Sequence, residues 1–576
     1  MLTDIGIGVK EDHMTTPGQF TLHSQNLGSL PIVNFFLARI GLADHLRNYL
    51  PPGDARLRLA PAAVVEVVVA NLVAGHRPVY ALGEWAAPYD PAVLGLAVGD
   101  AEMLNDDRVG RTLDRLFDAD RASLITATVL AVIRDFGVET TQLHNDSTTV
   151  TVTGAYPDAD GRDRGGKATP AIRHGHNKDY RPDLKQLLFI LTISADGAVP
   201  IAYRVADGNT PDDAGHIPTW DQLRTLVGSA GFLYVADSKL CSKQAMGHIA
   251  SHGGRFVTVV PHGRREDTWF RGWAQTHAPT WAEARRAPGA RLGDPDRVWR
   301  TFEAPAPSVD GYRVIWVHSS TKAARDAAAR AARIEAGLAA IDAVATRLAT
   351  PKTRIKTKVA AEAAATTALT GAGATRWVAF TINQASDVSF RQERRGRRGS
   401  ATRYRRAEKP IFTITAAIRA DNVAYDAATD GAFPTITNDT VMTPAQVLAA
   451  YHYQPNLERR NHMLKGPQEV APVYLETPHR IEALLLCHFL AMLVEALIER
   501  EIRTSMKTQG LAGIPLYPEL RNCPAPSAPR ILEIFNDVKR HHLGSGDQIV
   551  QTFQPQLTPL QQQVLDLLHI PASIYS

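Results

Sequence analysis

The 576-residue sequence has little cysteine and no strong excess of either charge. Its three cysteines, Cys241, Cys487 and Cys523, are too far apart for a disulfide framework or paired zinc ligands, which favours a reducing compartment. The formal net charge is only +4, so contact with nucleic acid would have to come from local basic clusters. With 44% hydrophobic and 21% charged residues, the composition is that of a soluble globular protein.

Signals for secretion or membrane insertion are also lacking. The first residues, MLTDIGIGVKEDHM, contain no basic segment followed by an apolar core, so no secretory signal is expected. The most apolar run, residues 481–502, is interrupted by Glu482, His488 and Glu495. We therefore expect a buried helix there rather than a membrane span, and a cytoplasmic protein.

The length predicts several structural units. After a tail, residues 1–30, the apolar spacing across residues 31–137 is helical, with Pro and Gly between segments. An all-helical N-terminal domain is expected, and it either binds DNA or serves only in packing.

In residues 138–261 the hydrophobic pattern becomes typical of strands, and the predicted elements follow the order β-β-β-α-β-α-β. Three consecutive strands with short links favour antiparallel pairing, whereas helical crossovers favour parallel neighbours. The prediction is an α/β fold with a mixed five-stranded sheet, in the order typical of a ribonuclease-H-like core.

The remaining sequence predicts an interruption of this core. Residues 262–440 combine a long Ala-rich helix with flanking strands, which indicates an α+β insertion. Residues 441–505 resume the core, with helices separated by a strand-like PVYLE at 472–476, and residues 506–576 form a C-terminal extension without a readable motif.

Two carboxylates lie on predicted strands that are neighbours in this order. Asp146 interrupts the β-branched run QLHNDSTTVTV, where Asp is poorly tolerated, and Asp237 ends the fourth strand, GFLYVAD. The two would meet at one edge of the sheet, as ligands of a hard divalent metal must. Alternatively, Asp146 marks a turn and Asp237 caps the helix that follows.

A third carboxylate, Glu458, lies in YHYQPNLERRNHMLKGP. Tyr451, Glu458 and Lys465 are seven residues apart, so on one helix they would share a face. The alternative is an exposed amphipathic helix with incidental charges.

This spacing, after two strand-borne aspartates, resembles the YREK motif of bacterial insertion-sequence transposases of the DDE type. HNDSTTVTVTGAYP, GHNKDYRPDLKQ, DGNTPDD, VADSKL, DGAFPTITND, PVYLETPHRIEALLL and the N-terminal NDDRVGRTLDRLFD resemble one branch of that group. Gln454 replaces the Arg that the motif expects, and Gln cannot offer a charged fork to a phosphate.

The resemblance implies that Asp146, Asp237 and Glu458 bind two Mg²⁺ ions, with Mn²⁺ as a possible substitute, and cleave phosphodiesters in line. Tyr451, Lys465 and the residue at 454 would contact the DNA backbone. The implied substrates are double-stranded DNA with terminal inverted repeats and target DNA, which a homodimer would bind near the nucleoid.

The densest basic cluster is RQERRGRRGSATRYRRAEKP, residues 391–410, with eight Arg and one Lys against two Glu. It is either a solvated loop or, as we expect from its density, a DNA contact. Lys178 lies in RHGHNKDYRPDLK, which contains the spacing H-x-H. This spacing could suggest a zinc site, but no further ligands complete one, so we expect a loop near DNA instead. The expected DNA-contacting arginines of the cluster are Arg394, Arg395, Arg397, Arg398, Arg405 and Arg406.

Two other functions are compatible with the same residues. A metal-dependent nuclease would cut DNA without strand transfer and would use the same three carboxylates. A DNA-binding protein on a decayed catalytic scaffold would keep the acids only as remnants.

Overall fold

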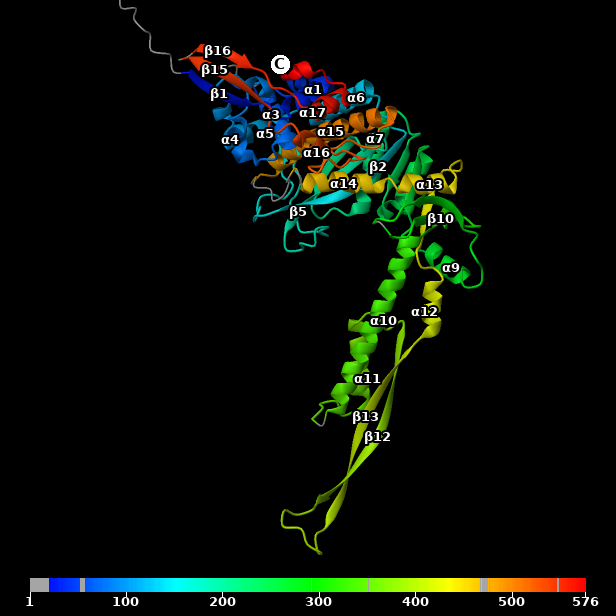
Figure 1. Cartoon of the computed structure of the whole chain (residues 1–576). Coiled ribbons are helices and arrows are strands. Elements are labelled where there is room, and N and C mark those ends of the chain that lie inside the picture. The colour runs from blue at the N-terminus through cyan, green and yellow to red at the C-terminus, as the bar shows by residue number, and fades with distance from the viewer. Residues whose placement is uncertain are drawn as a thin grey trace, which may run out of the picture. The chain divides into compact units, whose positions relative to one another are not determined.

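The computed structural model describes residues 20–51, 57–291, 293–350, 352–466, 468, 475, 477–545 and 548–576. The chain divides into two compact units, residues 1–256 with 452–576, and residues 257–451 (Figure 1). Most of the strand predicted at 472–476, and the tail before residue 20, lie outside the described residues. The N-terminal helices, most of both core segments and the C-terminal extension, predicted as separate parts, share the first unit.

The N-terminal region contains only helices between residues 27 and 141 of the part that the structure describes. The Asn105 side chain caps α5 by accepting from the Arg108 N–H, and Gly137, at φ 60°, ends α6 in a left-handed conformation that suits a residue without Cβ. The main helices are α1 (Leu30–Ile40), α2 (Leu42–Tyr49), α3 (Pro61–Ala74), α4 (Leu82–Ala86), α5 (Asp106–Asp118) and α6 (Arg121–Phe136).

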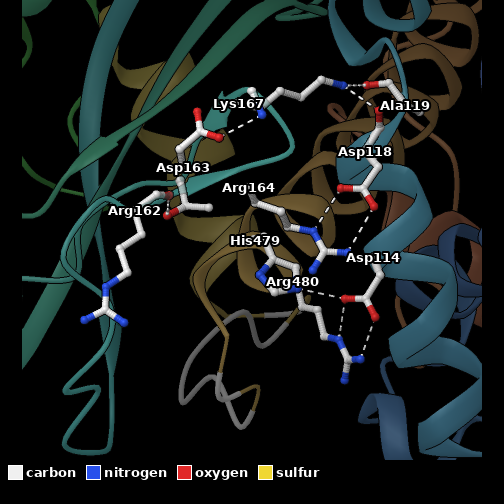
Figure 2. Close-up of polar contacts among 11 residues, drawn as sticks. Asp114, Asp118, Ala119, Arg162, Asp163, Arg164, Lys167, His479 and Arg480 are labelled. Carbon is white, nitrogen blue, oxygen red and sulfur yellow. Dashed lines mark hydrogen bonds and ion pairs between the residues drawn. The ribbon is translucent and has the colours of Figure 1, made fainter.

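Ion pairs attach α5 to other elements of the same unit (Figure 2). Asp114 accepts two hydrogen bonds from Arg480, at 2.7 and 2.6 Å, and forms a third with His479 at 2.8 Å. Arg164, on the short hairpin β3 (Asp163–Arg164) and β4 (Lys167–Ala168), donates two bonds to Asp118, at 2.9 and 3.0 Å. Charge-assisted hydrogen bonds therefore stabilise the packing of the N-terminal helices against the rest of the unit.

A small antiparallel sheet joins the two ends of the described chain. β1 (Phe20–Asn26) pairs with β15 (Lys539–Ser545), which also pairs with β16 (Gln548–Phe553). The sequence analysis predicted neither pairing, because β1 and β15 are more than 500 residues apart and each strand is short. The C-terminal extension also contains α16 (Ala528–Glu533) and α17 (Pro559–Leu567).

The core strands have the order β6-β5-β2-β7-β8, which is the predicted order, but among the described residues they belong to a sheet of nine strands, so the prediction of a five-stranded sheet is wrong. β2 pairs antiparallel with β5 and parallel with β7, and β5 pairs antiparallel with β6, so the sheet is mixed. The strands and the helices between them are β2 (Gln142–Val152), β5 (Lys185–Ser194), β6 (Pro200–Asp207), α7 (His216–Val227), β7 (Leu233–Ala236), α8 (Lys243–Ser251) and β8 (Arg255–Val259).

Two later helices pack on this sheet. α14 (Gln454–Lys465) contacts β2 and β5, and α15 (Pro478–Thr508) contacts β6 as well as α3 and α5. α15 is long and apolar enough to cross a membrane, but 94% of its most apolar window is buried inside the protein. This burial agrees with the expectation of a core helix.

Glu495 is a fully buried carboxyl on α15. Gln468 donates to its Oε2 at 2.8 Å, and the Oε1 atom of Gln468 lies 3.1 Å from His488 Nδ1. Burial raises the pKa of Glu495 from 4.5 to about 8, so the neutral form is favoured in the folded protein.

The raised pKa of Glu495 predicts a pH-dependent stability. Its contribution is complete below pH 4.5 and is lost as the pH rises towards and through 8, because the unfolded state releases the proton first. We expect Glu495→Gln to melt higher than the wild type at pH 8, by an amount that shrinks towards pH 5. Melting curves across this range measure the effect, and a constant difference between the two proteins would contradict it.

In the second unit, β14 pairs with β11, β11 with β10, and β10 with β9, and all three pairings are antiparallel. The last residues of β8 pair with β14. The predicted Ala-rich helix is α10. The elements of this unit are α9 (Arg265–Trp273), β9 (Ala282–Ala287), β10 (Arg297–Glu303), β11 (Arg313–Ser319), α10 (Ser320–Ala349), α11 (Lys358–Gly371), β12 (Val378–Gln392), β13 (Tyr404–Ile418), α12 (Ala420–Ala427), β14 (Ala432–Thr437) and α13 (Pro444–Tyr451).

β12 and β13 form a long two-stranded ribbon that extends beyond α10 and α11 (Figure 1). Near its base, the ribbon packs in a core with these two helices through Val378, Ile382, Phe412 and Ile414. Residues 383–391 of β12, in contrast, are all exposed. We call the part formed by residues 383–411 the distal ribbon.

Candidate active site

The pairing of β2 with β7 places the two predicted aspartates next to each other. The strands are parallel and Asn145 lies opposite Ala236, so the following residues are Asp146 and Asp237. Both line a small cavity of about 10 Å³, which is roughly the space of one water molecule. The two acids that we selected from the sequence therefore share one site.

Asp237 also has the alternative role that the sequence allowed. Its side chain caps the short helical turn Ser238–Leu240 by accepting from the Lys239 N–H at 3.0 Å. A carboxylate has two oxygens and several lone pairs, so capping and metal binding are compatible roles for one aspartate.

Asp212 is a third acid at the cavity, and we did not select it from the sequence. Its Oδ1 accepts from Ser147 Oγ at 2.8 Å, and its Oδ2 lies 3.7 Å from Lys178 Nζ. Lys178 Nζ is also 3.7 Å from Asp146 Oδ1. The only sequence signal for Asp212 was its place in DGNTPDD, directly after a core strand.

The environment of Asp146 makes its ionisation less favourable than that of an ordinary aspartate. Burial raises the pKa of Asp146 to about 6; Lys178 opposes this shift, while Asp237 and Asp212 add to it. Burial also lowers the pKa of His216, whose Nε2 lies 4.0 Å from Asp237 Oδ1. A bound cation would relieve the repulsion between the carboxylates.

α14 contacts β2 through one stripe of side chains. Gln454 Nε2 donates to Asn145 O at 3.1 Å, and Asn461 Nδ2 donates to Asp146 Oδ2 at 3.4 Å. Glu458 lies four residues after Gln454 and three before Asn461, hence on the same stripe, and its side chain is exposed. Asn461 was not selected from the sequence, where an amide gives no signal of its own.

The three predicted metal ligands are not preassembled. Among the residues that the structure describes, no group of three His, Cys, Asp or Glu side chains is arranged to hold a metal ion. Asp146 and Asp237 meet at the cavity, whereas Glu458 is not among the residues that line it.

The predicted single helix carrying Tyr451, Glu458 and Lys465 is wrong. α13 ends at Tyr451 and α14 begins at Gln454, because Pro455 cannot donate a backbone hydrogen bond and is suited to the first turn of a helix. Tyr451 belongs to the second compact unit, where the centroid of its ring lies 6.2 Å from that of Phe433. The spacing of seven therefore does not place it on a face with Glu458.

Three predicted DNA contacts have partners within the protein. Gln454 is buried, and its Oε1 lies 2.9 Å from His144 Nδ1. Lys465 Nζ donates to Asp179 Oδ1 at 2.6 Å, while Lys178 lies among the acids described above. DNA contact by either lysine would require it to leave these partners.

The basic cluster lies within the distal ribbon: its two ends are on β12 and β13, and its middle is the loop that joins these strands at the tip. Arg391 and Arg405 lie directly opposite each other on β12 and β13, where like charges repel. Arg406 pairs with Glu408 at 2.7 Å. The remaining arginines selected from the sequence are exposed at the tip: Arg394, Arg395, Arg397 and Arg398.

The chemistry of the side chains at the cavity, rather than their present spacing, suits a hard divalent ion. Asp146, Asp237 and Asp212 offer carboxylate oxygens, which Mg²⁺ and Mn²⁺ prefer. His216 Nε2 and Asn461 Oδ1 are buried and make no hydrogen bond with any residue that the structure describes. Two polar atoms beside the acids are therefore available to a bound ion or its water ligands.

Comparisons with known proteins give limited matches. Residues 22–130 match a family described as a domain of unknown function, DUF4277. No curated protein matches. A solved structure titled as a cryo-EM synaptic complex of piggyBac transposase with hairpin DNA aligns with a TM-score of 0.24 and 13% identity, over 48% of this chain and 55% of that chain. The alignment thus spans just over half of that protein.

Proposed function

We propose that this protein is a DDE transposase of a bacterial insertion sequence, with a ribonuclease-H-like catalytic core. The observation that carries the proposal is the register of β2 and β7, which brings Asp146 beside Asp237. The strand order β6-β5-β2-β7-β8 supports it, as does the match of residues 22–130 to a domain that occurs in transposases.

In this proposal Asp146, Asp237 and Glu458 hold two Mg²⁺ ions, for which Mn²⁺ can substitute. When bound, the ions supply charge stabilisation for in-line attack on a phosphodiester. Glu458 lies on the face of α14 that contacts β2, and a change of its side-chain rotamer brings its carboxylate towards the aspartates. Lys465 holds the DNA backbone after leaving Asp179.

The proposed substrates are DNA ends with inverted repeats and a target DNA, bound by a homodimer in the bacterial cytoplasm. A nuclease that cuts without joining shares every residue of this site. The two functions differ only in whether a cut 3′-end is transferred.

An assay with DNA that flanks the gene tests the proposal. Wild-type protein is incubated with this DNA, a target plasmid and Mg²⁺, Mn²⁺ or EDTA. Nicks at the element ends and joined products, both dependent on metal, are expected. Nicks without joined products would favour the nuclease, and DNA binding without nicks would favour the decayed scaffold.

The distal ribbon supports DNA binding. A two-stranded ribbon without a core is marginally stable, and the major groove of DNA accommodates such a ribbon. At its tip the exposed arginines outnumber the acids, so they suit contact with phosphates.

We expect that replacing the four tip arginines, Arg394, Arg395, Arg397 and Arg398, with Ala weakens DNA binding by roughly 10- to 100-fold and reduces the dependence on salt. Fluorescence anisotropy at several salt concentrations measures both quantities. The matched control removes four exposed arginines that are already paired with acids: Arg134, Arg162, Arg286 and Arg521. Equal losses in the two variants would contradict a specific role for the ribbon.

A further inference from the structure

Lys178 has an unusual position for a lysine in a loop. Its Nζ lies 3.7 Å from both Asp146 Oδ1 and Asp212 Oδ2, and donates to Ser147 Oγ at 2.8 Å. The side chain is only 28% exposed. Its ammonium therefore occupies a place between two carboxylates.

The loop that carries Lys178 is held by its own bonds. Asn177 Oδ1 accepts from the backbone N–H groups of Asp179 and Arg181, at 2.8 and 3.2 Å. Asp179 in turn pairs with Lys465. Two adjacent residues of this segment therefore have opposite roles: Lys178 neutralises the acids, and Asp179 neutralises Lys465 of α14.

We propose that Lys178 is an internal counter-ion that occupies the position of a divalent cation between Asp146 and Asp212 and leaves when the metal binds. This inference rests on the proposed function, because it concerns the metal site of the same acids. It also adds Asp212 to the residues that face the cation.

Simple electrostatics explains the exchange. An ammonium stabilises the clustered carboxylates while no metal is bound, and a divalent ion does so more strongly. Two cations cannot share this small space without repulsion. The displaced lysine, a compact charge on a flexible stem, then becomes available to a DNA phosphate.

Metal affinity without DNA tests the first part. Free Mn²⁺ is followed by electron paramagnetic resonance during titration of the wild type, Lys178→Gln and Lys239→Gln. Lys239 is exposed and lies two residues after Asp237, so its replacement removes the same charge. We expect Lys178→Gln to bind Mn²⁺ about tenfold more tightly, and Lys239→Gln to change less than about twofold.

Amine labelling of the wild type tests displacement directly, without relying on a variant. Mg²⁺ is expected to raise acetylation of Lys178 several-fold in peptide mass spectra and to leave Lys239 unchanged. Unchanged labelling of Lys178, or equal Mn²⁺ affinity of Lys178→Gln and the wild type, would overturn the inference while the metal site stands. Absence of Mn²⁺ binding in all three proteins would overturn the metal site as well.

Discussion

Asp146→Asn is expected to reduce metal-dependent DNA nicking about a thousandfold. A loss of roughly 4 kcal/mol of charge stabilisation in the transition state corresponds to this factor. The variant should remain folded, because Asn has nearly the same shape and removes a partly buried carboxylate whose pKa is raised to about 6. Its melting temperature at pH 8 should equal or exceed that of the wild type.

Asp213→Asn is the matched control for this prediction. Asp213 is exposed and adjacent to Asp212, so the same charge is removed close to the site. Its nicking rate should stay near that of the wild type. Nicking by Asp146→Asn at the wild-type rate would show that the catalytic site lies elsewhere.

Glu499→Ala is expected to destabilise the first unit by about 3–5 kcal/mol. Glu499 pairs with Arg460 at 2.9 Å, and both side chains are 1% exposed. Glu499 also accepts from the Ala528 N–H at 3.0 Å, while Arg460 donates to Ala198 O. Removing the acid leaves a buried guanidinium without its counter-ion, which thermal or chemical unfolding will detect.

Two control variants distinguish the effect of burial from the effect of charge on stability. Glu519→Ala breaks an exposed pair with Arg521 and should cost less than about 1 kcal/mol. The double variant Glu499→Leu with Arg460→Met removes both buried charges and should recover part of the loss, because Arg503, which also pairs with Glu499 at 3.2 Å, still loses its counter-ion. If Glu499→Ala were no worse than Glu519→Ala, the buried pair would not support α14.

Much of the core was predictable because its signals are local. Strand and helix periods indicated the order of elements from Gln142 to Val259, and Asp146 was recognisable as an acid inside a strand. The Ala-rich run likewise predicted α10. The break before Gln454 is not apparent from the spacing of the motif, which suits one continuous helix, whereas Pro455 starts a new one.

The sequence by itself determined the main elements of the core, their order and the two acids that the order brings together. Only the tertiary structure decided which side chains surround them. Asp212, Lys178 and Asn461 gather around Asp146 from three separate segments, and β1 pairs with β15 across more than 500 residues. Backbone periodicity acts over a few residues, whereas such contacts depend on how whole elements pack, which no local pattern encodes.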